Sequence, residues 1–111
     1  MLTEKDYCDY DTCVALKELG YSESFPLSKD YEVLGKDYDI LLYEAQKWLR
    51  EEKGMLLQPT YLELSDTWIC VIRDKNKRHG YSAPTQKDYE EALAEGIKEA
   101  VKTLKEIGNG V

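Results

Sequence analysis

The C-terminal part of the chain carries the pattern that most constrains the fold. From Tyr89 to Ile107, apolar side chains recur every three or four residues, as they do along one face of an α-helix. Asp88 and Glu91 have the spacing of a capping box, which marks the start of this helix, and its end is predicted before Gly108. An amphipathic helix is stable only when another element covers its apolar face, so the chain must supply that cover elsewhere. The face comprises Tyr89, Ala92, Leu93, Ile97, Ala100, Val101, Leu104 and Ile107, and Gly96 within it predicts a close crossing with a strand or another helix.

Two apolar runs, Met55 to Leu64 and Thr67 to Arg73, are predicted to provide this cover. Both are rich in β-branched and aromatic residues, and the Ser65-Asp66 pair between them favours a turn, so they predict an antiparallel hairpin. Pro59 has no N–H for a strand ladder, which places the first run at an edge. The second run lacks polar alternation and is expected at the centre, with much of both faces covered. A third short strand is expected at about Arg78 to Ser82.

The ends of a first helix are also marked. Asp9 is suited to accept hydrogen bonds from the amides two and three residues further on, so a helix is predicted from about Tyr10 to Leu19. Gly20 is expected to end it in the left-handed conformation, with Tyr21 packing back on the helix as in a Schellman motif.

A second helix is predicted from about Leu41 to Lys53, where Gly54 ends it. Residues 21 to 40 are expected to form a loop over the core, because serines, a proline and a glycine break any helical period there. The alternative within this segment is a short edge strand at Tyr31 to Leu34. The apolar face of the second helix comprises Leu41, Leu42, Ala45, Trp48 and Leu49.

These elements follow the order α-α-β-β-(β)-α. We expect an α+β fold in which a small antiparallel sheet of two or three strands packs against helices. Residues 1–111 are expected to form a single domain, because the length suits one domain and the chain shows no low-complexity linker and no repeat. The last helix is predicted to cover the hairpin, since these are the two largest apolar surfaces.

Composition bounds the partners and the compartment. Acidic residues outnumber basic ones by 22 to 15, and the net charge of -7 disfavours nonspecific attraction to nucleic acid or anionic lipid. No apolar run approaches the ~20 residues that a membrane-spanning helix needs, and the first residues lack the apolar region of a secretory signal. Three cysteines at irregular spacing suit reduced thiols. We therefore expect a cytoplasmic protein that does not contact a membrane.

No motif of catalysis or cofactor binding appears in the sequence. Cys8, Cys13, Cys70 and His79 are zinc-ligand types, but their spacing is too wide for a zinc site, and Cys8 and Cys13 fit a hydrophobic staple around the start of the first helix. His79 has no neighbouring nucleophile of the kind that a hydrolase needs. We predict no enzymatic activity, no catalytic residue, no metal and no cofactor.

A basic cluster raises an alternative function. Arg73, Lys75, Lys77 and Arg78 stand close in sequence to aromatic residues, and cations beside aromatic rings can hold a phosphate backbone and stack bases. The order of helix, three strands and helix is also that of a double-stranded RNA-binding domain. The cluster is small, however, and the chain is acidic, which favours a charged hairpin tip over nucleic-acid binding.

Three stretches, Asp9–Tyr21, Gln46–Gly54 and Asp88–Lys102, resemble small uncharacterised proteins encoded by phages and mobile elements of gut anaerobic bacteria. The resemblance implies an origin in a phage or mobile element and a similar fold, and it transfers no catalytic or binding residue. In that context, the acidic N-terminal third is a second alternative: its carboxylates would imitate the phosphates of DNA and occupy a host protein.

The expected function is that of a small protein-interaction domain without catalysis. Its partner is expected to be another protein, bound through an exposed aromatic or apolar patch. Tyr31 and Tyr38 are the candidate binding residues, because neither belongs to the apolar face of a predicted helix.

Overall fold

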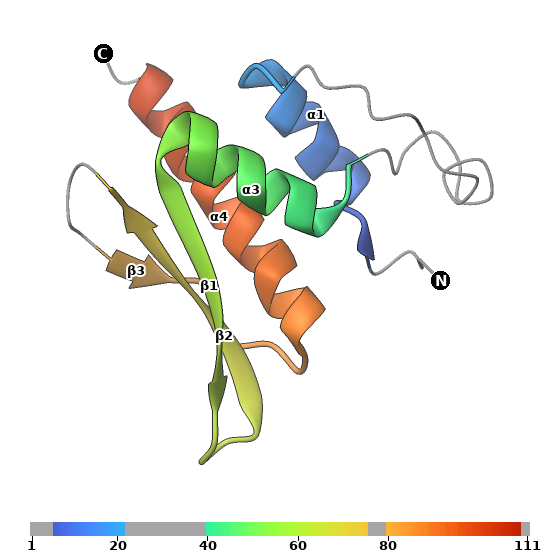
Figure 1. Ribbon diagram of the computed structural model, residues 1–111, viewed down its shortest axis with the longest axis vertical. Helices are drawn as coiled ribbons and strands as arrows, with labels where there is room; N and C mark the ends of the chain where they lie inside the picture. Colours follow the sequence, from blue (N-terminus) through green and yellow to red (C-terminus); the bar gives the residue numbers. More distant parts are fainter. Residues whose placement is uncertain (1–5, 22–39, 76–79, 110–111) are drawn as a thin grey trace.

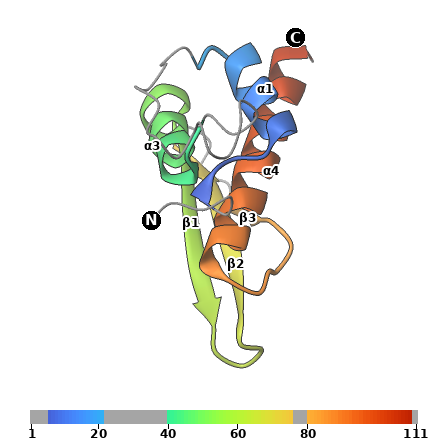
Figure 2. The same cartoon turned by 90° about the vertical axis from the view of Figure 1, so that its right-hand side faces the viewer.

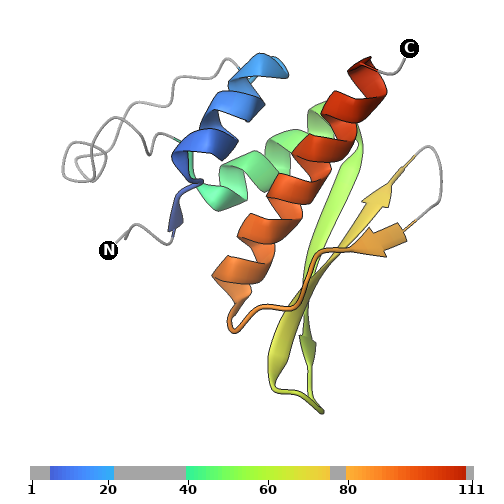
Figure 3. The ribbon, with the colours of Figure 1, turned by 180° about the vertical axis from the view of Figure 1, so that it is seen from behind.

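The computed structural model describes residues 6–21, 40–75 and 80–109, which form three helices and a three-stranded antiparallel sheet (Figure 1). The elements are α1 (Tyr10–Glu18), α3 (Leu42–Lys53), β1 (Met55–Leu62), β2 (Thr67–Asp74), β3 (Gly80–Ser82) and α4 (Tyr89–Asn109). This order confirms the predicted α+β fold. Helices α3 and α4 contact the sheet, and α1 packs against α4 on the side away from the strands (Figures 1 and 3).

β2 is the central strand and β1 lies at an edge, as Pro59 predicted. Gln46 of α3 closes part of this edge, because its Nε2 donates a hydrogen bond of 2.9 Å to the carbonyl of Leu57. Alternate residues of an antiparallel strand direct their backbone groups to the same side, so the nitrogen of Pro59 also faces this edge, where the missing N–H removes no ladder bond. Both features hinder pairing with a further strand.

The strand boundaries differ slightly from those predicted. β1 ends at Leu62 instead of Leu64, because the turn occupies residues 63–66 and not the Ser65-Asp66 pair alone. Asp66 takes a left-handed conformation in this turn, with φ of 54°. The third strand forms over Gly80–Ser82, while positions 78 and 79 of that prediction lie outside the described residues.

Helix α4 begins as predicted and ends later. Asp88 Oδ1 accepts a hydrogen bond of 2.8 Å from the amide of Glu91, which caps the first turn. The helix was expected to stop before Gly108, but it continues to Asn109. A glycine lowers the stability of a helix but does not have to end it, so Gly108 alone does not determine where α4 stops.

The core lies between α4 and the hairpin, as predicted. Cys70, Ile72 and Ile97 are completely shielded from solvent, each with an exposed fraction of 0%. Gly96 crosses directly over Cys70: a Cβ at position 96 would lie 2.8 Å from the Cβ of Cys70. The glycine therefore allows the helix and the central strand to approach more closely than any larger residue permits.

The two faces of β2 are covered unequally. Cys70 and Ile72 face the helices and are buried, whereas Ile69 and Val71 alternate onto the opposite face and are only half-buried. The strand was expected to be covered on much of both faces. Among the described residues both helices that contact the sheet lie on one face (Figure 2), which buries Cys70 and Ile72 but leaves Trp68, near the hairpin turn, half-buried.

Local capping defines the ends of α1. At its start, Asp9 Oδ1 accepts a hydrogen bond of 2.8 Å from the amide of Thr12. At its end, Gly20 adopts a φ of 112°, and the amide of Tyr21 donates to the carbonyl of Leu16 at 3.0 Å, which is the long bond of a Schellman motif. The predicted cap and the predicted ending are both confirmed, and α3 ends at a second left-handed glycine.

Candidate functional site

The predicted binding residues are only partly described by the structure. Tyr31 and Tyr38 lie outside the described residues, as do Lys77 and Arg78. The rest of the basic cluster, Arg73 and Lys75, is exposed near the C-terminal end of β2. Of the predicted binding residues, the structure therefore shows the surroundings of Arg73 and Lys75 alone.

Trp68 and Tyr81 are the described aromatic residues that flank the basic cluster in sequence, and both lie on the face of the sheet opposite Arg73. Arg73 and Trp68 lie five positions apart on β2, about 17 Å along the strand, and alternation directs them to opposite faces. Tyr81 is half-buried, and its hydroxyl forms a hydrogen bond of 2.6 Å with Thr103 Oγ1 of α4. Neither ring is placed to stack a base beside the Arg73 guanidinium.

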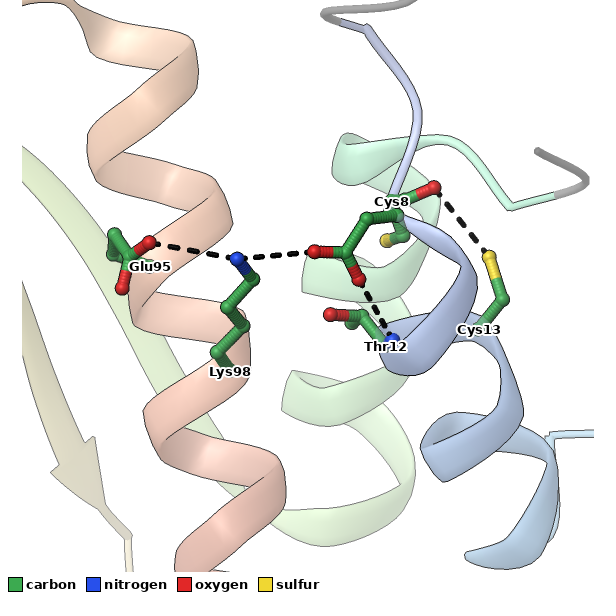
Figure 4. A network of polar contacts seen from close by, with 6 residues as sticks. Cys8, Thr12, Cys13, Glu95 and Lys98 are labelled. Carbon is green, nitrogen blue, oxygen red and sulfur yellow. Dashed lines mark hydrogen bonds and ion pairs between the residues drawn. The ribbon is translucent and has the colours of Figure 1, made fainter. Parts of the chain in front are cut away.

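A cleft of about 440 Å³ lies between α1 and α4. Figure 4 shows Lys98 extending from α4 toward the start of α1, where its Nζ lies 3.0 Å from Asp9 Oδ2 and 3.5 Å from Glu95 Oε1. A second ion pair of 2.7 Å joins Lys105 to Glu18. Because both ion pairs join a residue of α4 to a residue in or next to α1, we assign them to the attachment of α1 to α4.

The Asp9–Lys98 pair also shifts two pKa values. Partial burial raises the pKa of Asp9, but hydrogen bonds from Thr12 and the neighbouring Lys98 ammonium outweigh it, so this pKa lies below its ordinary value. The hydrogen bond with Asp9 raises the pKa of Lys98. Both side chains are charged at neutral pH and hold each other in place.

Three aromatic rings form a continuous row at the other end of α4, with a half-buried tryptophan between two exposed tyrosines. The centroid of Trp68 lies 5.3 Å from that of Tyr61 and 5.5 Å from that of Tyr89, and the second pair meets edge to face at 83°. Tyr61 and Tyr89 expose 44% and 41% of their surface. We call Tyr61, Trp68 and Tyr89 the aromatic surface.

Strand register and the path of the chain build the aromatic surface. Tyr61 and Trp68 are directly opposite each other in the pairing of β1 with β2. Beyond β3, Trp68 and Gln86 exchange backbone hydrogen bonds of 2.8 Å in each direction, which brings the chain alongside Trp68 just before α4 starts at Tyr89. The hairpin extends past this first turn of α4 (Figures 1 to 3).

Polar and apolar groups at the hairpin turn border this surface. The hydroxyl of Tyr61 donates a hydrogen bond of 2.7 Å to Asp66 Oδ1, which raises the pKa of Tyr61 and fixes its ring. Leu64 in the turn is fully exposed, with no cover from any described residue. Exposed aromatic and aliphatic side chains gathered in this way are typical of protein-binding surfaces.

A small pocket of about 140 Å³ adjoins the aromatic surface through Tyr89. The N-terminal segment contributes to it because Tyr7 pairs with Leu41 in an isolated bridge, which sets Asp6 beside the start of α3. Its lining consists of Asp6, Leu42, Tyr43, Tyr89, Glu90 and Leu93.

The sequence did not predict this site. Tyr89 was assigned to the buried face of the last helix and Trp68 to the core of the hairpin, but Tyr89 is largely exposed and Trp68 half-buried. The available signal was position: Tyr89 is the first residue of α4, where no turn before it covers the ring. Tyr43 is more exposed than Tyr89, since it lies outside the apolar face of α3.

The buried cysteines do not form a reactive site. Cys8, Cys13 and Cys70 are buried thiols, and burial raises the pKa of Cys70 to about 11. The Cys13 thiol donates a weak hydrogen bond of 3.6 Å to the backbone carbonyl of Cys8, at the start of α1. In the described part of the chain, no three His, Cys, Asp or Glu side chains gather closely enough to hold a metal ion.

Comparison with protein families, with curated proteins and with solved structures finds no match to this chain. The similarity to proteins of phages and mobile elements therefore stays a prediction. None of the described helices is long and apolar enough to cross a membrane.

Proposed function

We propose that this protein is an interaction domain without catalysis, which binds another protein through the aromatic surface. The observation that carries this proposal is the row of rings in which half-buried Trp68 lies between the exposed rings of Tyr61 and Tyr89. Tyrosine and tryptophan are the residues that most often dominate the binding energy of protein interfaces, because they bury a large area with few rotatable bonds.

The contacts that hold the three rings in place favour a role in binding over a purely structural role. Trp68 is held between two tyrosines, and Tyr61 is held by Asp66, so the surface is arranged before a partner arrives. Side chains that are ordered in advance lose less conformational entropy on binding. Tyr61 and Tyr89 contribute less to the core than a fully buried ring would, since each keeps about two-fifths of its surface in solvent.

The aromatic surface takes the place of the binding residues that were predicted from the sequence. Tyr31 and Tyr38 remain a proposal of the sequence, outside the described residues. An origin in a phage or mobile element, also a proposal, would make a viral or host protein the natural partner.

The proposal is tested by purifying the tagged protein with its partners from its native host cells. Tyr61→Ala removes an exposed ring and should reduce the recovery of a specific partner, since the loss of a central aromatic contact costs ~2 kcal/mol or more of binding free energy. Tyr10→Ala is the matched control, because Tyr10 is 55% exposed on α1 and lies outside the aromatic surface. Equal recovery with both variants would contradict the proposal.

Tryptophan fluorescence provides a direct second measurement. The chain has two tryptophans, so Trp48→Phe leaves Trp68 as the sole reporter. Addition of the recovered partner should shift the Trp68 emission to shorter wavelength as the ring leaves water. An unchanged spectrum at saturating partner would show that binding occurs elsewhere.

A further inference from the structure

The pocket beside Tyr89 combines an apolar floor with aromatic walls and acidic edges. Leu42 and Leu93 at its base are buried, with exposed fractions of 4% and 3%. Tyr43 and Tyr89 rise from neighbouring helices and expose 59% and 41% of their surface. Two carboxylates, those of Asp6 and Glu90, complete the lining.

This lining selects a cation attached to an apolar stem. An apolar ligand alone would remove the carboxylates from water without compensating for their lost hydration. An anion would meet like charge in the pocket and in the net charge of -7. A basic side chain matches this lining, because its methylene groups can pack on the leucines, its positive charge is attracted by the acidic lining, and its head group can stack on a tyrosine ring.

Glu90 is available for such a contact. Among the described residues it has no hydrogen bond or ion pair. Its position in the first turn of α4 also favours a negative charge through the helix dipole, and the same dipole disfavours a bound cation there. The two tyrosine rings supply the attraction that a helix start alone does not, whereas Asp6 lines the pocket but already has an interaction of its own.

We propose that this pocket, which we call the cation pocket, receives an arginine side chain of the protein partner. Arginine is favoured over lysine because its planar guanidinium stacks on aromatic rings and can donate two parallel hydrogen bonds to the Glu90 carboxylate. Since Tyr89 belongs to both the pocket and the aromatic surface, the arginine would bind at the edge of the proposed interface. This inference rests on the proposed function for its biological setting and can be tested without the partner.

The probe is acetyl-arginine amide, titrated into the isotope-labelled protein and followed by amide NMR shifts. We expect saturable shifts at positions around Tyr43, Tyr89 and Glu90. Glu90→Gln and Tyr43→Ala should each weaken binding by about twofold to thirtyfold, the range of a cation–π or exposed charge contact. Tyr10→Ala should leave the affinity unchanged.

The neutral isostere acetyl-citrulline amide separates charge from shape. It has nearly the same size but no positive charge, so it should produce no saturable shifts in the pocket. Equal binding of both compounds, or arginine-induced shifts confined to other surfaces, would overturn the inference. Equal affinity of wild type, Glu90→Gln and Tyr43→Ala for the arginine compound would overturn it as well.

The two proposals fail in different ways. Loss of partner recovery with Tyr61→Ala, together with no arginine binding by NMR, would retain the interaction surface and reject the cation pocket. Arginine binding by NMR, with partner recovery unaffected by Tyr61→Ala, would retain the cation pocket and reject the proposed interface.

Discussion

At Gly96, helix α4 comes close to Cys70 of the sheet. The Sγ of Cys70 is the nearest atom to the position of a Cβ on Gly96, and the Cβ of Cys70 follows at 2.8 Å. Neither partner has room to move, because both lie in the core between α4 and β2. Burial also keeps the Cys70 thiol protonated at neutral pH, since its pKa is about 11.

Replacement of this glycine tests the contact. Gly96→Ala gains up to ~1 kcal/mol in helix propensity, but the added methyl group overpacks the core, which typically costs ~1–3 kcal/mol. We expect net destabilisation in urea unfolding, partly recovered in the double variant Gly96→Ala/Cys70→Ala, where the nearest atom is gone. A single variant more stable than wild type would show that helix propensity outweighs packing at this position.

At the scale of elements, α1 is held by its own ends and by α4. Asp9 does both, because one carboxylate oxygen accepts from the Thr12 amide and the other pairs with Lys98. The side chains of Asp9 and Lys98 are nearly half exposed, at 47% and 44%, so solvent screens their attraction and the cap carries more of the stability than the ion pair.

Acid should weaken this attachment in a predictable direction. The pKa of Asp9 is lower in the folded protein than the ordinary value of about 3.9, so its contribution is fully present above that value and is lost as the pH falls through the folded pKa. Asp9→Ala should cost ~1 kcal/mol at pH 7, and the difference from wild type should shrink as the pH falls below 4. Urea unfolding at both pH values measures it.

Asp9→Asn is the control for the cap. Asparagine also caps helices, so this variant should retain most of the stability while losing the charge that pairs with Lys98. A loss as large as that of Asp9→Ala would assign the stability to the ion pair. A difference between Asp9→Ala and wild type that stays constant with pH would contradict the assignment to the carboxylate.

At the scale of the whole molecule, net charge and the placement of the basic residues bear on nucleic-acid binding. The net charge of -7 repels a polyanion at long range, and Arg73 lies on the face of β2 opposite Trp68. Few phosphate contacts can form from a cluster of four bases, and such contacts weaken steeply with salt.

We therefore expect no specific nucleic-acid complex at physiological salt. Gel shifts with single- and double-stranded DNA and RNA, at low and physiological salt, measure this directly. Salt-sensitive binding tighter than about micromolar would reverse the conclusion if neutralising Arg73, Lys75, Lys77 and Arg78 abolished it.

Features set by neighbouring residues were predictable from the sequence. The caps at Asp9 and Asp88 and the left-handed ending at Gly20 depend on contacts within a few positions, so residue type and spacing suffice. Pro59 predicted an edge position for β1 because a residue without an N–H cannot donate a hydrogen bond to a neighbouring strand in any sheet. The apolar face of α4 predicted that the helix would cover the hairpin, and the structure shows this packing.

The candidate site required the tertiary structure. Its residues come from the N-terminal segment, α3, the hairpin and the start of α4, and no local pattern encodes their meeting. Sequence periodicity assigned Tyr89 and Trp68 to buried positions, whereas exposure depends on where the neighbouring elements end. The hairpin extends beyond the first turn of α4. Tyr89 and Trp68 belong to the apolar pattern that builds the core, but at this end of the molecule Tyr89 stays largely exposed and Trp68 half-buried.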